Sequence, residues 1–500
     1  MAPRSLENES AGGPRERLVL VGNGMAGARV LEELVARGGM SRYAVTVLGE
    51  EPTGAYNRVL LSGMLNGTYQ AQDLLLQPAE WYARHGITLH AGDRVTAVDR
   101  GAREVRTESG RRVPYDRLVL ATGSRAALPA LPGLTRADGA RLEGVFVFRT
   151  LEDCRAISAY GQGCRRALVL GGGLLGLEAA CGLRDLGLEV TILQRGGHLM
   201  DRQLDTEGAR VLEARIRSRG VEVRVNAAAA EVRGERAVTG LVLADGTELP
   251  CELLVLACGI QPNVELAREC GLPVARGILV DDQLRTEDPH IRALGECAEH
   301  RGMMYGLVAP LWEQAAVLAR SLLGEPGAAY GGSRVTTRLK VVGIELTTLG
   351  SVDPRDDRDE VVQYAEPQRG IYQKLLIREG RLVGAILLGD GDRAPYLTQL
   401  WDRGGPLPSV RASLLFDLGG RPGSLSPEEM PDEAVVCHCN GVRKGDLREC
   451  LAGGARGFHE VVQATRACTG CGSCKPLVRT LIEAALRSAV PSASPVGAGS

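Results

Sequence analysis

Cysteines crowd near the C-terminus in a spacing that suits metal chemistry. Cys437 and Cys439 form one close pair, and 31 residues separate them from a second pair, Cys471 and Cys474. Two pairs of thiolates give each iron of a [2Fe-2S] cluster its two protein sulfurs. Four thiolates can also hold a structural zinc ion, although zinc sites more often carry the C-x2-C spacing in both halves. The spacing predicts a metal site and favours a redox cluster, with zinc as the alternative.

A glycine-rich turn near the N-terminus indicates a second kind of chemistry. Gly22, Gly24 and Gly27 follow a G-x-G-x-x-G pattern, which lets backbone N–H groups approach a pyrophosphate at the start of a helix. Glu50 comes 23 residues after Gly27, where a carboxylate can accept hydrogen bonds from a ribose. The alternative is a glycine-rich turn without a ligand. The residues expected at this first dinucleotide site are Gly22, Gly24, Met25, Ala26, Gly27 and Glu50.

The same turn recurs about 150 residues later. Here the acid expected after the second strand is missing, and Gln194 and Arg195 stand in its place. An arginine can accommodate a 2′-phosphate, so this exchange favours NADPH over NADH. The alternative is that Arg195 is a solvated surface charge. The residues expected at this second site are Gly171, Gly173, Leu174, Leu175, Gly176, Gln194 and Arg195.

Alternating strands and helices must position these turns. Each glycine turn follows a short apolar run and precedes a helical stretch, which is typical of a doubly wound α/β fold. The expected strands are 18–21, 44–48, 117–120, 167–170, 189–193, 253–256 and 291–294, and the expected helices are 28–37 and 177–186.

The second half of the chain has a different composition. Strands expected at 338–349, 370–377 and 381–388 indicate a small α+β domain, and a Pro/Gly/Ser-rich segment after it is typical of a linker. We therefore expect two doubly wound dinucleotide-binding domains, a small α+β domain and a small helical C-terminal domain. The expected boundaries are a disordered lead-in at 1–16, a discontinuous first domain at 17–150 and 252–328, a second domain at 151–251, the α+β domain at 329–418, a linker at 419–434, the cysteine domain at 435–487 and a disordered tail at 488–500.

Composition excludes several classes of function. The net charge of the 500-residue chain is -2, and the absence of a basic run argues against a nucleic-acid partner. Neither a secretory signal nor an apolar stretch of about 18 residues is present, so we expect no membrane association and a cytoplasmic location. In such a compartment the 13 cysteines are thiols or metal ligands. The oligomeric state stays open.

Several longer motifs carry a family resemblance. The motifs are VGNGMAG (21–27), AYNRVLLS (55–62), ATGS (121–124), GGGLLGLEAA (171–180), LMDRQLD (199–205), GECA (295–298), GLVAP (306–310), CHCNGVRKGDL (437–447) and TRACTGCGSCKPLV (465–478). With them, residues 1–420 resemble the FAD- and NAD(P)-binding pyridine nucleotide oxidoreductases, in particular the NAD(P)H nitrite reductase large subunit and the electron-transfer subunit of assimilatory nitrate reductase. The C-terminal region is similar to the [2Fe-2S] domain of bacterioferritin-associated ferredoxin.

The resemblance implies a role for individual residues. It places FAD at the first site and NAD(P)H at the second. Glu296, Thr122 and Gly123 would contact the FAD, Arg58 would lie near the isoalloxazine, and Glu178 would lie near the contact between nicotinamide and flavin. The four cysteines that would bind the [2Fe-2S] cluster are Cys437, Cys439, Cys471 and Cys474. Cys468 lies three residues before Cys471, and its position is compatible with a spare ligand or, as we expect, a bystander.

The expected function follows from these cofactors. Flavin exchanges electrons singly or in pairs, so hydride from NAD(P)H would reach FAD and single electrons would leave through the cluster. The chain stops before the region that carries sirohaem in nitrite reductases, so we expect the acceptor to be a separate nitrate or nitrite reductase catalytic subunit. The alternatives are an FAD/[2Fe-2S] subunit of an amino-acid or imino-acid dehydrogenase and, more remotely, a binding element for an iron-storage protein. Ser62 stands where a single-thiol peroxidase or oxidase would need cysteine.

Overall fold

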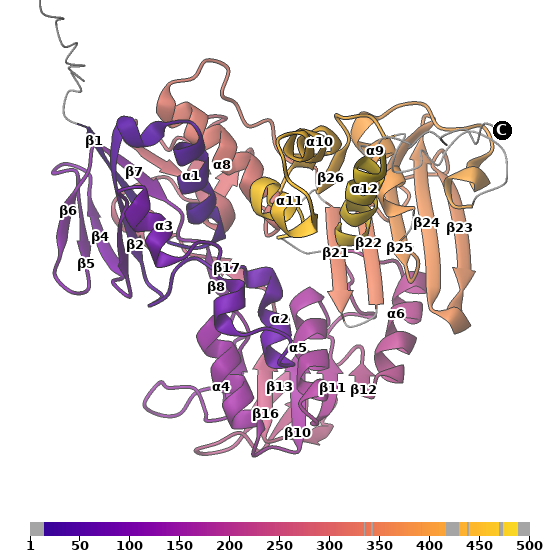
Figure 1. The fold of residues 1–500 in the computed structure, drawn as a ribbon. Coiled ribbons are helices and arrows are strands. Elements are labelled where there is room, and N and C mark those ends of the chain that lie inside the picture. The colour runs from indigo at the N-terminus through magenta and orange to yellow at the C-terminus, as the bar shows by residue number, and fades with distance from the viewer. Residues whose placement is uncertain are drawn as a thin grey trace, which may run out of the picture.

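A computed structural model describes residues 15–334, 336–341, 344–391, 393–416, 430–437, 440–469 and 474–488. These residues form two α/β units, a third domain built on an antiparallel sheet, and a small helical domain (Figure 1). This arrangement confirms the predicted fold class. Most of the predicted lead-in and tail, and residues 419–429 of the predicted linker, lie outside the described residues.

The first unit is a five-stranded parallel sheet in the order β19-β7-β1-β2-β3. Its central strands are apolar because helices cover the sheet, and Leu18 and Leu20 of β1 are fully buried. The elements are β1 (Glu16–Val21), α1 (Met25–Ala36), β2 (Tyr43–Gly49), α3 (Ala79–Arg84), β3 (Thr88–Ala91), β7 (Arg117–Leu120), β19 (Ile291–Ala293) and α8 (Val308–Leu323), with a side sheet of β4 (Val95–Asp99), β5 (Glu104–Thr107) and β6 (Arg112–Pro114).

The second unit repeats this plan in the order β12-β11-β10-β16-β9. Its elements are β9 (Val145–Val147), α4 (Leu151–Gly161), β10 (Arg166–Leu170), α5 (Leu174–Asp185), β11 (Glu189–Leu193), α6 (Thr206–Ser218), β12 (Val221–Arg224), β16 (Leu253–Leu256) and the antiparallel strands β13 (Ala229–Arg233), β14 (Gly240–Leu243) and β15 (Glu248–Pro250). Two short strands, β8 (Ser124–Ala126) and β17 (Ile260–Pro262), pair where the chain passes between the units.

Several boundaries differ from the expected ones. Strands β9 and β16 belong to the second sheet, although they lie outside the expected range 151–251, because β16 pairs in parallel with β10 and β9 pairs in parallel with β16. Both glycine-turn helices begin three residues earlier than expected, at Met25 and Leu174. They do so because Gly24 and Gly173 are extended N-cap residues, so that each helix starts directly at the turn.

The third domain packs against the second unit (Figure 1). Its sheet runs in the order β21-β22-β25-β24-β23, with α9 (Ala394–Arg403) against it. The expected strand 338–349 is two antiparallel strands, β21 (Thr336–Val341) and β22 (Ile344–Gly350); the others are β23 (Glu360–Glu366), β24 (Ile371–Arg378) and β25 (Arg381–Leu388). Tyr372 donates to Asp205 of the second unit at 2.6 Å, and Lys374 forms an ion pair with the same carboxylate.

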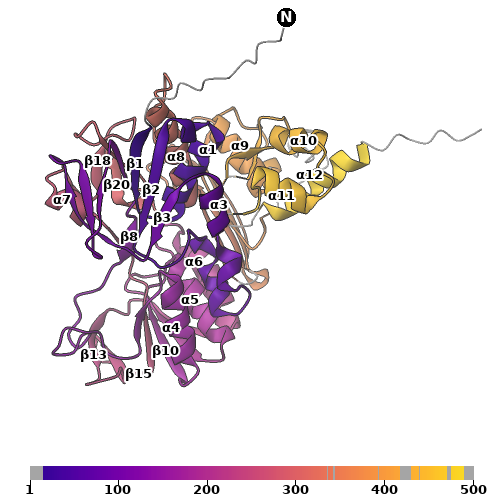
Figure 2. The same ribbon diagram turned by 60° about the vertical axis from the view of Figure 1, so that its left-hand side comes forward.

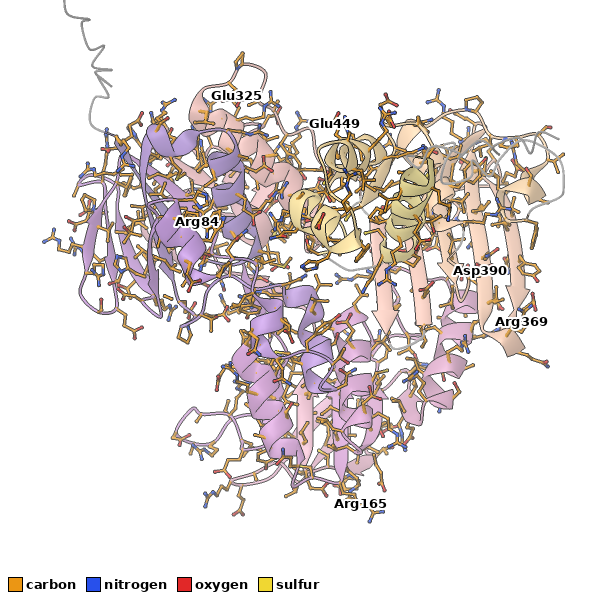
Figure 3. All side chains as sticks on the ribbon, viewed as in Figure 1. Arg84, Arg165, Glu325, Arg369, Asp390 and Glu449 are labelled. Atoms are coloured by element: carbon orange, nitrogen blue, oxygen red, sulfur yellow. The ribbon has the colours of Figure 1, made fainter. Side chains whose placement is uncertain are left out.

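The C-terminal domain is small and mostly helical. It contains β26 (Val435–Cys437), β27 (Val442–Arg443), α10 (Lys444–Ala452), α11 (Phe458–Thr465) and α12 (Lys475–Ser488). Met430 and Ala434, from the end of the expected linker, are buried in its core, so this part of the linker belongs to the domain. Figure 2 shows these helices beside the first unit. Figure 3 labels one residue in each part: Arg84 in the first unit, Arg165 in the second unit, Arg369 in the third domain and Glu449 in the C-terminal domain.

Within the described ranges, no helix combines the length and the apolar character that a membrane span requires.

Candidate functional site

The first glycine turn can be built only from glycine at two of its positions. Gly22 has a φ of +106°, and a Cβ there would lie 2.2 Å from the carbonyl oxygen of Ala121. A Cβ on Gly27 would lie 2.3 Å from the oxygen of Gly22, so this glycine lets the helix pack closely on the strand. Gly24 differs, because a Cβ there would meet nothing within 4 Å. Gly24 therefore leaves open space directly at the N-terminus of α1, where a pyrophosphate would be bound.

The second turn has the same construction. Gly171 has a φ of +122° and its Cβ would lie 2.4 Å from the oxygen of Ala257. A Cβ on Gly176 would lie 1.9 Å from the oxygen of Gly171, whereas one on Gly173 would meet nothing within 4 Å. Both turns therefore fit a dinucleotide in the same way.

One cavity of about 2060 Å³ connects the two turns. Small-molecule pockets usually measure roughly 300–1,000 Å³, so this cavity has room for two dinucleotides. Gly27 and Gly176 are absent from its wall because they face the packed helix–strand contact. The other predicted nucleotide-site residues all line it: Gly22, Gly24, Met25, Ala26, Glu50, Arg58, Thr122, Gly123, Gly171, Gly173, Leu174, Leu175, Glu178, Gln194, Arg195 and Glu296.

The residues that follow the second strand of each unit lie in different environments. Glu50 is exposed, and its carboxylate lies 3.7 Å from Arg94. Gln194 is buried, accepts a hydrogen bond from the backbone N–H of Gly172 at 2.9 Å, and donates to Asp201 at 3.0 Å. Arg195 is exposed at the cavity wall. In the second unit, therefore, Gln194 holds the turn and Arg195 is the side chain left to meet a ligand.

A half-buried arginine lies at the cavity wall. Arg58 forms an ion pair with Glu51 and donates to the carbonyl oxygen of Arg149 at 2.9 Å. Its guanidinium also lies 4.9 Å from the ring centroid of Tyr56, whose hydroxyl donates to Glu51. These contacts fix a positive charge at the place where the resemblance expects the isoalloxazine.

A second cluster of polar side chains surrounds Glu296 at the cavity wall. Its carboxylate accepts a hydrogen bond from the Ser124 hydroxyl at 2.7 Å and forms an ion pair with Arg149. Arg149 could not be predicted from the sequence because it belongs to no motif and reaches Glu296 across 147 positions of the chain. The predicted residue Thr122 donates from its hydroxyl to the carbonyl oxygen of Asn263 at 2.7 Å, which holds the loop after β7 against the cavity.

Glu178 lies on α5 with its side chain at the cavity wall. Burial raises the pKa of this carboxyl group to about 8. A carboxyl group of this kind changes charge near neutral pH, which is a common property of functional sites.

The described part of the cysteine site contains three thiols. Cys437 and Cys474 are buried, and Cys474 Sγ lies 3.5 Å from Cys468 Sγ; Cys439 and Cys471 lie outside the described residues. The hydrogen bond with Cys474 and burial raise the pKa of the Cys437 thiol. Neighbouring buried thiols give up their protons when a metal binds them, so Cys437 and Cys474 suit a metal site.

The cysteine domain is joined to the first unit by buried polar contacts that the sequence analysis did not predict. Asn57 donates to the carbonyl oxygen of Thr469 at 2.7 Å, and the indole of Trp312 donates to Asn440 at 2.9 Å. Arg466 forms an ion pair with Glu32 of α1. Asn57 lies between the cavity residues Tyr56 and Arg58, and Trp312 follows the cavity residue Leu311. Asn440 and Thr469 of the cysteine domain therefore contact residues that are sequence neighbours of the cavity wall.

Three family models match consecutive parts of the chain. The model described as pyridine nucleotide-disulphide oxidoreductase matches residues 16–316, the rubredoxin NAD+ reductase C-terminal domain matches 336–404, and the BFD-like [2Fe-2S] binding domain matches 435–484. These matches confirm the predicted cofactors, which are FAD, NAD(P)H and a [2Fe-2S] cluster.

Relatives cover nearly the whole chain. Nitrite reductase [NAD(P)H] of Bacillus subtilis (strain 168) is 39% identical over 476 residues, which are 95% of this chain and 58% of that protein. The assimilatory nitrate reductase electron transfer subunit of the same organism is 37% identical over 472 residues, 94% of this chain and 59% of that protein. The chain thus spans under two thirds of the length of these relatives.

Solved structures share the fold. The ferredoxin reductase for the CYP199A2 system from Rhodopseudomonas palustris matches with a TM-score of 0.70 and 28% identity, covering 78% of this chain and 96% of that one. The reductase in the covalent putidaredoxin reductase–putidaredoxin complex matches with a TM-score of 0.71 and 27% identity, covering 80% of this chain and 96% of that one.

Proposed function

The chain belongs to the pyridine nucleotide-disulphide oxidoreductase family, and on that premise we propose that it carries electrons from NAD(P)H through FAD and the [2Fe-2S] cluster to a nitrate- or nitrite-reducing catalytic centre. The observation that carries this proposal is the contact of the cysteine domain with sequence neighbours of the wall of the cavity that both glycine turns line. The two relatives named above support the nature of the acceptor. One of them is called an electron transfer subunit, which supports a catalytic centre on another polypeptide.

The glycine turns would hold the two dinucleotides. FAD, when bound, supplies a centre that takes hydride as an electron pair and releases electrons singly. Gly24 and Gly173 leave the helix N-termini open to the two pyrophosphates, so the partial positive charge of each helix favours the ligand. Because both turns line one cavity, the residues that would hold the two ligands share a single site.

The polar residues of the wall would orient the flavin. Arg58, held by Glu51 and by the carbonyl oxygen of Arg149, keeps a fixed cation at the wall. A fixed cation stabilises negative charge that develops nearby, without a cost for reorganising the site. Glu296, held by Ser124 and Arg149, would accept hydrogen bonds from ligand hydroxyl groups with its remaining lone pairs.

The contact between Asn57 and Thr469 supports an internal exit for electrons. Asn57 is buried, and its side-chain oxygen also accepts from the N–H of Val59, so its amide is held at both ends. Thr469 lies two residues before Cys471, one of the four predicted cluster ligands. A hydrogen bond thus links Thr469 directly to Asn57, the residue between Tyr56 and Arg58 of the cavity wall.

Anaerobic titration of the FAD- and cluster-loaded protein with NADH and, separately, with NADPH tests the proposal. We expect both the flavin and the cluster absorbance to bleach. The matched variant Cys474→Ala should lose the cluster signal while its flavin still bleaches. Bleaching of the flavin by an amino acid, and not by either nicotinamide, would overturn the proposal in favour of a dehydrogenase subunit.

A further inference from the structure

Asn440 connects the first unit to the cysteine site through a single side chain. It is 8% exposed and lies three residues after Cys437. Its oxygen accepts a hydrogen bond from the Trp312 indole of α8 at 2.9 Å. Its nitrogen lies 3.8 Å from the Sγ atom of Cys437. The same nitrogen donates to the carbonyl oxygen of Arg466 at 2.7 Å and to the hydroxyl of Thr469 at 3.0 Å.

The partners determine which way this amide faces. An indole N–H can only donate, so the atom of Asn440 that faces Trp312 must be the oxygen. A carbonyl oxygen can only accept, so the atom that faces Arg466 must be the nitrogen. The amide nitrogen of Asn440 is therefore on the side of Cys437, where its two N–H groups are shared among the Cys437 sulfur, the Arg466 carbonyl oxygen and the Thr469 hydroxyl, and a flipped amide would break the hydrogen bonds on both sides.

We propose that Trp312 and Asn440 are positioning residues that couple docking of the cysteine domain to the reduction potential of the cluster. The proposal rests on the proposed function in one respect, namely that Cys437 ligates the cluster through which electrons leave. Reduction adds one electron to the cluster and makes it more negative by one charge, with no bond formed or broken in the protein. An N–H group directed at a ligand sulfur stabilises that extra charge and raises the potential.

The Trp312 indole acts on the cluster through the amide. A hydrogen bond accepted at the oxygen of an amide polarises it and strengthens the bonds that its nitrogen donates, by about 10–30% per bond. Docking, which brings Trp312 to Asn440, therefore favours the reduced cluster. By thermodynamic linkage the reduced cluster must favour docking by the same factor.

The midpoint potential of the cluster in the full-length, FAD- and cluster-loaded protein tests this coupling. It is measured by EPR during mediated redox titration, so it needs no electron from NAD(P)H. We expect Trp312→Phe, which keeps an aromatic ring but removes the indole N–H, to shift the cluster equilibrium about twofold toward the oxidised state, a potential lower by ~18 mV at ~59 mV per factor of ten for one electron. Asn440→Leu should shift it by about tenfold, or ~59 mV.

Two further variants separate this coupling from a purely structural contact. The double variant Trp312→Phe/Asn440→Leu should show no more shift than Asn440→Leu alone, because Trp312 acts through Asn440. Trp401→Phe is the matched control, since Trp401 is equally buried but lies in the third domain. An unchanged potential in Trp312→Phe, or additive shifts in the double variant, would overturn the inference. A protein without any [2Fe-2S] EPR signal would instead overturn the proposed function, so the two failures are distinguishable.

Discussion

The two glycine turns of this protein have nearly the same backbone and present different side chains to a ligand. In both turns the first glycine has a positive φ and lies against a carbonyl oxygen, and the third lies against the first. The difference begins where the second strand ends. After β2, the exposed Glu50 lies near Arg94, whereas after β11 the buried Gln194 is bound to Gly172 and Asp201. The comparison teaches that close packing fixes the turn, while one position after the strand sets the chemistry of recognition.

The largest effect should come from a methyl group at the first glycine of either turn. Gly22→Ala and Gly171→Ala would each place a Cβ within 2.2–2.4 Å of a backbone oxygen at a positive φ. The left-handed backbone alone costs roughly 1–2 kcal/mol, and the clash adds to it. We expect the thermal midpoint to fall by roughly 10 °C, at ~2–4 °C per kcal/mol for a large domain. Gly22→Ala should also lose FAD, whereas Gly171→Ala should keep FAD and lose bleaching by NAD(P)H.

The middle glycines provide the control for this prediction. A Cβ at Gly24 or Gly173 would meet no protein atom within 4 Å. Gly24→Ala and Gly173→Ala should therefore leave the thermal midpoint of the ligand-free protein unchanged and weaken only ligand binding. Differential scanning fluorimetry with and without added FAD measures both effects. If Gly24→Ala destabilised the ligand-free protein as strongly as Gly22→Ala, close packing would not be what distinguishes these positions.

Local spacing explains why the turns could be predicted from the sequence and the contacts around them could not. Each glycine pattern lies in the same βαβ unit as the residues that follow its second strand: Glu50 in the first unit, and Gln194 and Arg195 in the second. The short chain between them therefore fixes their distances. Arg149 reaches Glu296, and Asn57 reaches Thr469, only because separate domains pack together. The second of these contacts spans 412 positions. Such pairs carry no periodic signal, so no property of either segment alone marks them.

The next largest effect should come from the residues that differ after the second strand of each unit. Arg195 is exposed at the cavity wall and accommodates a 2′-phosphate if it reaches one. We expect Arg195→Ala to weaken the binding of NADPH about tenfold, because a charge-assisted hydrogen bond of ~1.5 kcal/mol is lost. The binding of NADH should be unchanged. Steady-state reduction of ferricyanide with each donor measures the ratio of their kcat/KM values.

Arg165→Ala is the matched control for Arg195→Ala. Arg165 is also exposed and pairs with Glu189, but it lies directly before β10 and away from the cavity wall (Figure 3). Arg165→Ala should change the kcat/KM value of neither NADPH nor NADH. An Arg195→Ala variant with the same ratio of NADPH to NADH as the unmodified protein would mean that Arg195 is a solvated surface charge.

The smallest effect is a dependence of stability on pH that only the second unit should show. Burial raises the pKa of Glu178 to about 8, above the value of about 4.3 expected in the unfolded chain. Between these two values the folded protein keeps a proton that the unfolded chain has released, so the free energy of unfolding falls as the pH rises. The fall ends above pH 8, where both states are ionised.

Glu178→Gln should remove this part of the pH dependence because an amide does not titrate. We expect the thermal midpoint of the variant, relative to the unmodified protein, to rise by about 2–3 °C between pH 7 and pH 8, which corresponds to about 1 kcal/mol at the steepest slope of ~1.4 kcal/mol per pH unit. Glu189→Gln, an exposed carboxylate on the neighbouring β11, is the control and should follow the unmodified protein. Parallel curves for Glu178→Gln and the unmodified protein would show that water reaches Glu178 and keeps it ionised at neutral pH, and the second unit would then differ from the first only after its second strand.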